Sequence, residues 1–229
     1  MNRVALGLSY DGHEFEGWQT QPHGRTVQDY LTKAIQAIAQ EPVALTCAGR
    51  TDTGVHARQQ VVHFDTVADR PLTAWVKGVN NSLPPSISVQ GAKQIDSSFH
   101  ARFSAVSRTY RYYFYSAPVR DPFKRFMTWV HYPLDLQAMR NASACLLGTH
   151  DFSAFRASQC QAASPVRTLH AMNLIEVGDL ILVRPPAGSK AAAKPAPKSS
   201  SDMARAETPK TDTPKADAPK ADTAKEVVA

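Results

Sequence analysis

Residues 43–66, VALTCAGRTDTGVHARQQVVHFDT, decide the fold because two predicted strands flank a polar motif in this stretch. Residues 43–48 and 59–66 each contain Val and Thr, which favour extended backbone, and each has the length of a short strand. Between them lies GRTDTGVHA, with the tripeptide Asp-Thr-Gly at 52–54. The two strands therefore hold a short polar loop in place, and the neighbouring sequence decides what the loop does.

The segments around this stretch extend it to the order β-α-β-β-α-β. Residues 3–10 alternate apolar and small side chains, as a strand does, and residues 86–95 form another strand. Residues 26–40 carry a helical apolar stripe behind Thr26 as N-cap, and residues 71–83 are predicted to form a short helix. This order is typical of a split βαβ, ferredoxin-like unit, an arrangement that often carries RNA-binding domains.

The same pattern begins again after residue 106. Residues 107–116 form an aromatic strand, residues 133–148 a helix, and residues 167–178 and 179–184 two further strands. The predicted core positions of the helix are Leu136, Met139, Ala142, Ala144 and Leu147. A final helix and strand do not follow. We therefore predict an α+β protein with two ferredoxin-like units around a central antiparallel sheet, the second unit being incomplete.

The predicted division of the chain has three parts. They are an N-terminal unit with the polar motif over 1–105, an incomplete C-terminal unit over 106–184 and a tail over 185–229. The tail repeats every five residues, as ETPKT, DTPKA, DAPKA and DTAKE, and it has no aromatic residue. Such a composition buries little apolar surface, so the tail is predicted to be disordered and dispensable for stability.

Composition narrows the class of protein. The net charge of +6 is compatible with a polyanionic partner but is also common without one. Three widely spaced cysteines without a CxxC favour a reducing compartment and give no zinc site. The sequence contains no signal peptide and no apolar run of membrane-spanning length, so a cytoplasmic protein without membrane contact is expected.

The Asp-Thr-Gly tripeptide allows three interpretations. It is a hairpin turn if Gly54 only supplies positive φ, but a turn does not require Arg50, His56 and Arg58 around one carboxylate. It is half of a protease dyad only if a second copy exists, and the chain has none. The third interpretation is a nucleophilic Asp52 kept charged by Arg50, beside basic residues that grip phosphates.

A nucleophile that acts on RNA needs an aromatic surface for a base withdrawn from its stack. Residues 108–115, RTYRYYFY, provide tyrosines interleaved with Arg108 and Arg111. A strand buried in a core would account for tyrosines at alternate positions. It accounts less well for a strand in which aromatic side chains and arginines occur together.

Four motifs of the chain resemble those of the tRNA pseudouridine synthase A family. They are YDGHEFEGWQTQP (10–22), AGRTDTGVHARQQVVHF (48–64), FHARFSAVSRTYRYYF (99–114) and GTHDFSAFRAS (148–158). The resemblance runs from about residue 3 to residue 183, and the second motif is highly specific. It implies that Asp52 is the nucleophile, that Arg50 pairs with Asp52 and fills the space of the flipped base, and that Tyr110 packs on the uracil.

The resemblance further implies an isomerase that converts uridine to pseudouridine at positions 38, 39 and 40 of the tRNA anticodon stem and loop. No cofactor or metal is needed, because the reaction involves no redox change and no group donor. The expected phosphate contacts are Arg25, Arg58, Arg102, Arg108 and Arg111. The expected partner is the anticodon stem-loop, and the expected assembly is a homodimer.

The sequence departs from the family after Val183, where a strand and a long helix usually follow. In the family this segment lines the cleft, supplies a basic residue near the nucleophile and builds the dimer interface. The C-terminal segment is therefore expected to be missing or replaced. The alternative function is a catalytically impaired RNA-binding fragment of the same family.

Overall fold

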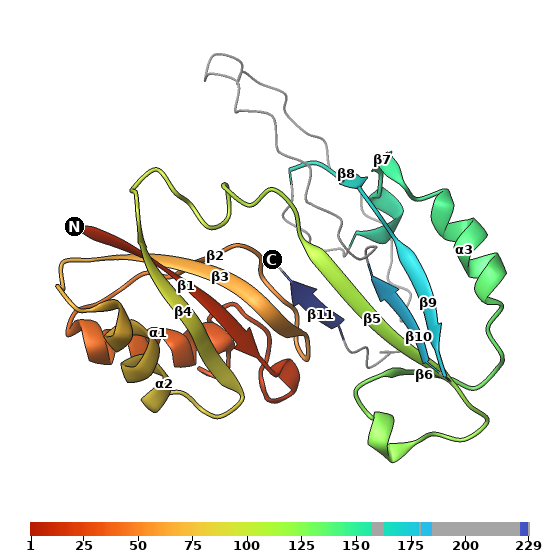
Figure 1. Cartoon of the computed structure of the whole chain (residues 1–229), viewed down its shortest axis with the longest axis horizontal. Helices are drawn as coiled ribbons and strands as arrows, with labels where there is room; N and C mark the ends of the chain where they lie inside the picture. Colours follow the sequence, from red (N-terminus) through yellow and green to blue (C-terminus); the bar gives the residue numbers. More distant parts are fainter. Residues whose placement is uncertain (157–162, 179, 185–224, 229) are drawn as a thin grey trace, which may run out of the picture.

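The computed structural model describes residues 1–156, 163–178, 180–184 and 225–228 (Figure 1). Its strands are β1 Asn2–Tyr10, β2 Thr46–Cys47, β3 His56–Thr66, β4 Ile87–Ile95, β5 Thr109–Ser116, β6 Thr128–Val130, β7 Gly148–Asp151, β8 Val166–Leu169, β9 Asn173–Val177, β10 Leu180–Arg184 and β11 Lys225–Val228. Its helices are α1 Val27–Ala39, α2 Val79–Asn81 and α3 Leu136–Ala144, with short helical turns η1 Gly12–Glu14, η2 Ala74–Gly78, η3 Pro122–Lys124 and η4 Ser153–Phe155. The predicted α+β class is confirmed.

One sheet runs through both halves of the molecule. Its main path is β4-β1-β3-β11-β5-β10-β9, with β2 paired to β3 and β6 paired to β5. Most neighbours are antiparallel, as predicted, but β11 is parallel to β3 and β6 is parallel to β5. Figure 1 shows the first half with α1 and α2, the second half with α3, and β11 between them.

The hydrophobic core lies in the first half of the chain. Alternate residues of β1 are buried, and they pack with the apolar stripe of α1 and with η2, which contributes the buried Trp75. Helix α1 begins at a complete capping box between Thr26 and Asp29 and ends where Gln40 takes a left-handed conformation. The predicted helix over 26–40 is therefore present with the expected N-terminal signal.

Side chains in the second half of the chain are less buried than those in the first half. Helix α3 contacts β9, but none of its side chains is buried, so the prediction of five core positions on this helix is wrong. The predicted strand over 167–178 is two strands, because 170–172 separate β8, which pairs with β7 in a small second sheet, from β9. An apolar periodicity indicates which face of a helix is to be buried, but burial also requires a partner surface.

Residues 225–228 correct the prediction of a disordered tail. These four residues form β11 and lie within the sheet, so for them the prediction is wrong. Their Val-Val pair favours extended backbone, and the edges of β3 and β5 offer unpaired backbone groups to it. The sequence predicted that the second unit lacks a final strand, but β11 is present in the sheet. The other tail residues, 185–224 and 229, lie outside the described residues, so the predicted absence of a final helix stays a prediction.

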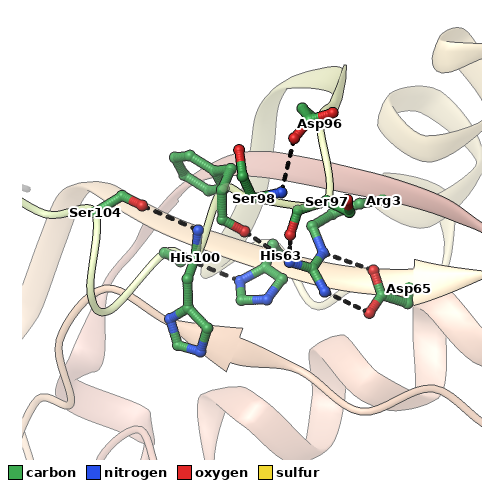
Figure 2. A network of polar contacts seen from close by, with 10 residues as sticks. Arg3, His63, Asp65, Asp96, Ser97, Ser98, His100 and Ser104 are labelled. Atoms are coloured by element: carbon green, nitrogen blue, oxygen red, sulfur yellow. Dashed lines mark hydrogen bonds and ion pairs between the residues drawn. The ribbon is translucent and has the colours of Figure 1, made fainter. Parts of the chain in front are cut away.

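A polar network fixes the segment 96–104, which connects β4 to β5 (Figure 2). The Arg3 guanidinium forms two hydrogen bonds of 2.7 Å with the Asp65 carboxylate and donates to the carbonyl of Phe99 at 2.8 Å. The amide of Ala101 donates to Nδ1 of the buried His63 at 3.1 Å. Because Nδ1 must accept this hydrogen bond, the contact between His63 and Ala101 exists only while that nitrogen carries no proton.

The stability of the fold is expected to fall in mild acid because of His63. Burial first, and then the Arg3 charge, lower the pKa of His63 below its ordinary value of 6.5. A lowered histidine pKa means that the folded state binds fewer protons than the unfolded state. The contribution of His63 to the free energy of unfolding is therefore complete above pH 6.5 and is lost as pH falls through the folded-state pKa. Urea unfolding at about pH 7.5 and about pH 5.5 measures this loss.

The matched comparison uses two glutamine variants. His63→Gln keeps an acceptor and removes the titration, so its unfolding free energy is expected to change less between the two pH values. The same substitution at the exposed His131 should leave the parental dependence unchanged. If His63→Gln shows the parental dependence as well, His63 is not the titrating group.

Within the described residues, no helix has the length and apolar character required to cross a membrane.

Candidate active site

The Asp52 loop connects β2 to β3 and is anchored on both sides of the carboxylate. The hydroxyl groups of Thr51 and the buried Tyr10 are 2.8 Å apart, and the amide of Trp18 donates to the carbonyl of Thr51 at 2.9 Å. After Asp52, its carbonyl accepts from the amide of Val55 at 3.2 Å, in a turn where Gly54 has a φ of +77°. Asp52 itself is exposed. The loop therefore presents a carboxylate to solvent from a fixed backbone.

The start of the loop is held by two side chains, one from β3 and one from the residue that precedes β5. Gln60 is fully buried, and its side-chain Nε2 donates to the carbonyl of Gly49 at 2.5 Å. Its side-chain Oε1 accepts from the backbone N–H of Gly49 at 3.4 Å. The Arg108 guanidinium donates to the carbonyl of Ala48. A Cβ at Gly49 would lie 2.9 Å from Nε of Arg108, so glycine leaves the room in which the guanidinium lies. Arg108 thus contacts the loop backbone, whereas the sequence predicted a phosphate contact.

Burial keeps the Tyr10 phenol protonated. It raises the pKa of Tyr10 to about 12, against the opposing effect of the hydrogen bond with Thr51. A neutral phenol in a buried position needs a hydrogen-bond partner, and Thr51 provides one beside the nucleophile candidate.

The opening motif packs directly on the far end of the loop. The amide of Gly12 donates to Nδ1 of His56 at 3.2 Å, and the same nitrogen is 2.9 Å from the Asp11 carboxylate. The nitrogen accepts from Gly12 when it is unprotonated and donates to Asp11 when it carries a proton. A Cβ built on Gly12 would lie 2.0 Å from the carbonyl oxygen of Val55. The close approach of these two backbones requires glycine at position 12.

Two tyrosines of β5 lie within electrostatic reach of Asp52. Burial raises the pKa of Tyr110 and of Tyr112, and the negative charge of Asp52 raises both further. For Tyr110 the nearby Arg108 acts in the opposite direction. Tyr110 as a residue is nevertheless 47% exposed, so it offers a surface to a ligand. The charge of Asp52 therefore acts on the predicted stacking residue, although the two are 58 positions apart in the sequence.

The arginines predicted to pair with Asp52 or to contact phosphates differ in exposure and in the groups they contact. Arg50 is exposed, and no ion pair of the described residues joins it to Asp52, so the pairing implied by the resemblance is absent from this structure. Arg25 donates to Glu16 from two of its nitrogens. The guanidinium of Arg102 lies 5.7 Å from the ring centre of Phe103. Arg111 on β5 is half-buried, with contacts of its own.

A pocket of about 490 Å³ lies beside the loop, between the first half and β5. Its lining includes His56, Arg58, Tyr113, Phe126 and Met127, together with residues of β1 and of the loop before β4. Phe126 contacts the His56 ring edge-on, with the ring centres 5.9 Å apart. Arg58 is thus placed at a concave surface next to the Asp52 loop.

Sequence reasoning missed the residues that support the loop. Thr51, Gln60 and Gly12 have no chemistry that singles them out, and their roles depend on contacts between distant segments. The one signal that all three carry is their place in quoted motifs, Gly12 in the opening one and Thr51 and Gln60 in the second. Among the described residues, no group of three or more His, Cys, Asp or Glu side chains is arranged to hold a metal ion.

Comparison with known proteins identifies the class to which this fold and site belong. The family model described as tRNA pseudouridine synthase matches residues 8–104 and 142–185. The chain therefore belongs to the tRNA pseudouridine synthase family.

Its relatives include proteins named tRNA pseudouridine synthase A. The one from Paraburkholderia phymatum is 53% identical over 185 residues, which are 80% of this chain and 69% of the relative. The one from Paraburkholderia xenovorans is 55% identical over 185 residues, or 80% of this chain and 68% of the relative. The one from Chromobacterium violaceum is 55% identical over 181 residues, or 78% and 69%.

Proposed function

We propose that this chain is an isomerase that converts uridine to pseudouridine at positions 38, 39 and 40 of the tRNA anticodon stem and loop. The observation that carries the proposal is the exposed Asp52 carboxylate on an anchored loop, next to the half-exposed Tyr110. Family membership supports the reaction class. The two proposed ferredoxin-like units, over 1–105 and 106–184, serve as the platform that carries the Asp52 loop and the strand with Tyr110.

In the proposed reaction the target uridine leaves its stack and its base packs on the Tyr110 ring. The Asp52 carboxylate then attacks either C1′ of the ribose or C6 of the base. The bond between N1 and C1′ breaks, the base turns, and a bond between C5 and C1′ forms. The bond that Asp52 made, to C1′ or to C6, breaks before the product leaves, so the carboxylate is regenerated. C5 loses its proton and N1 gains one, so the atoms of substrate and product are the same. A redox partner or group donor is therefore not required.

The surrounding residues act on binding and geometry. Arg50 is proposed to occupy the space that the flipped base leaves. Arg25, Arg58, Arg102 and Arg111 are proposed to contact phosphates of the tRNA, whose negative charge they complement. Arg108 is a positioning residue, because its guanidinium contacts the backbone of Ala48 and packs over Gly49. We also propose a homodimer that acts in the cytoplasm, where tRNA is available.

Replacing Tyr110 tests the stacking surface. Tyr110→Ala is expected to lower kcat/KM by about 5-fold to 150-fold, because stacking of a base on an aromatic ring is worth about 1–3 kcal/mol. Tyr110→Phe keeps the ring and should retain most of the rate, unless the hydroxyl moves a proton. Turnover of an anticodon stem-loop RNA measures both.

The control for Tyr110 is Tyr132→Ala, since Tyr132 is a comparably exposed tyrosine, at 55%, on the segment after β6. It is expected to match the parent. If Tyr110→Ala also matches the parent, β5 contributes only packing and the proposed place of the base is incorrect.

A tritium-release assay separates the proposed enzyme from a catalytically impaired RNA-binding fragment. Both bind tRNA, but only the enzyme releases the C5 hydrogen of the target uridine. Release of tritium from tRNA labelled at C5, measured with the full chain, therefore tests the proposed function itself.

A further inference from the structure

The last described strand occupies an inner position of the sheet. β11, Lys225–Val228, lies between β3 and β5, which do not pair with each other in the described residues (Figure 1). Its backbone register places position 227 opposite Ala57 of β3 and opposite Tyr110 of β5. The strand is thus adjacent both to the exit of the Asp52 loop and to the proposed stacking residue.

The position of β11 repeats the position of β4 in the first half. There, β1 lies between β4 and β3, both antiparallel to it, and β2 pairs with β3. In the second half, β5 lies between β11 and β10, both antiparallel to it, and β9 pairs with β10. β11 therefore completes the second half in the way that β4 completes the first.

An inner strand is recognised mainly through its backbone. Each N–H of an inner strand points to one of its two neighbours, so both β3 and β5 depend on β11 for pairing along this stretch. Without the strand, two sheet edges would face each other unpaired beside the active site. Extended peptides are bound in this way when they add to a sheet, with little dependence on particular side chains.

We infer that the space between β3 and β5 is a peptide-binding slot, that its occupant is the chain's own segment 225–228, and that the bound strand holds Tyr110 against the Asp52 loop. The segment fits the slot because Val227 and Val228 are adjacent and are the only valines after Arg184. The part of this inference that concerns catalysis rests on the proposed function. The part that concerns strand binding does not.

Proline substitutions in the full chain test the occupant. Val227→Pro removes an N–H from the middle of the strand and cannot continue the ladder. Ala216→Pro is the matched control, since it makes a proline in the five-residue repeat and leaves 225–228 intact. We expect Val227→Pro to speed amide exchange about tenfold or more in 56–59 and 109–112, and to lower the melting temperature by about 4 °C or more. Ala216→Pro should change neither.

A synthetic peptide tests the slot separately. A labelled peptide of residues 221–229, ADTAKEVVA, should bind the Val227→Pro chain saturably at one site and restore slow exchange in 109–112. It should bind the parent weakly, because the slot is filled, and the same peptide with proline at 227 should not bind. Parental exchange rates in Val227→Pro would overturn the inference. If amide exchange in 109–112 of the parent slows as its concentration rises, a second copy supplies the strand. That result would overturn the assignment of the strand to the same chain.

Activity then distinguishes this inference from the proposed function. If the parent releases C5 hydrogen, Val227→Pro should lose about tenfold or more of that rate and the peptide should restore it. If exchange and peptide binding follow the expected pattern but the parent has no activity, the slot stands and the proposed function fails. If the parent is active and Val227→Pro keeps the full rate, the strand does not position Tyr110.

Discussion

Asp52→Ala is expected to abolish pseudouridine formation while tRNA binding stays close to that of the parent. The carboxylate is the proposed nucleophile, and removing a nucleophile commonly costs at least about 10³-fold in kcat. Asp52→Asn should be as inactive, since the amide keeps the shape and loses the negative charge. Single-turnover tritium release and a filter-binding assay on the same tRNA measure the two properties.

The structure provides a matched control for this change. Asp69→Ala removes the same group from another exposed position, between β3 and η2, and should leave turnover unchanged. Neither substitution should alter the unfolding free energy by more than about 0.5 kcal/mol, because both side chains are exposed. Substantial turnover by Asp52→Ala would exclude Asp52 as the nucleophile.

Gly12→Ala is expected to damage both stability and activity, although it adds one methyl group. The new Cβ would lie 2.0 Å from the oxygen and 2.5 Å from the carbon of the Val55 carbonyl, so backbone has to move. Overpacking of this kind costs about 1–3 kcal/mol, and each kcal/mol lowers the melting temperature of a chain of this size by about 2–4 °C. The displaced Val55 is hydrogen-bonded to Asp52, so turnover should fall as well.

Gly7→Ala is the control, because a Cβ at that position in β1 meets nothing within 4 Å. Its melting temperature and turnover should match the parent. Parental behaviour of Gly12→Ala in both assays would show that the loop moves freely around position 55, and the account of its anchoring would be wrong.

Local patterns predicted the parts of this structure that local physics controls. Thr26 with Asp29 marked the start of α1, and the alternation of 3–10 marked β1, because capping and strand periodicity involve neighbours in sequence. The Asp-Thr-Gly loop was placed between strands for the same reason. These elements bring Asp52 to an exposed turn, as expected.

The features that escaped prediction depend on contacts between distant segments. β11 has four residues, and its strand character comes from the open edges of β3 and β5. Arg108 looked like a phosphate ligand, yet its guanidinium lies against Gly49, 59 positions earlier in the chain. The apolar positions of α3 predicted a buried face that the described residues do not cover. No single-segment pattern contains such information.

The most direct test of the account is a base-resolved measurement on a tRNA with uridine at positions 38, 39 and 40. The parent chain and Asp52→Ala are incubated with this tRNA, and pseudouridine is mapped by chemical modification and primer extension. The account predicts pseudouridine at these positions with the parent and unmodified tRNA with Asp52→Ala, which still binds it. Tight binding of the tRNA by the parent with no pseudouridine formed would contradict it.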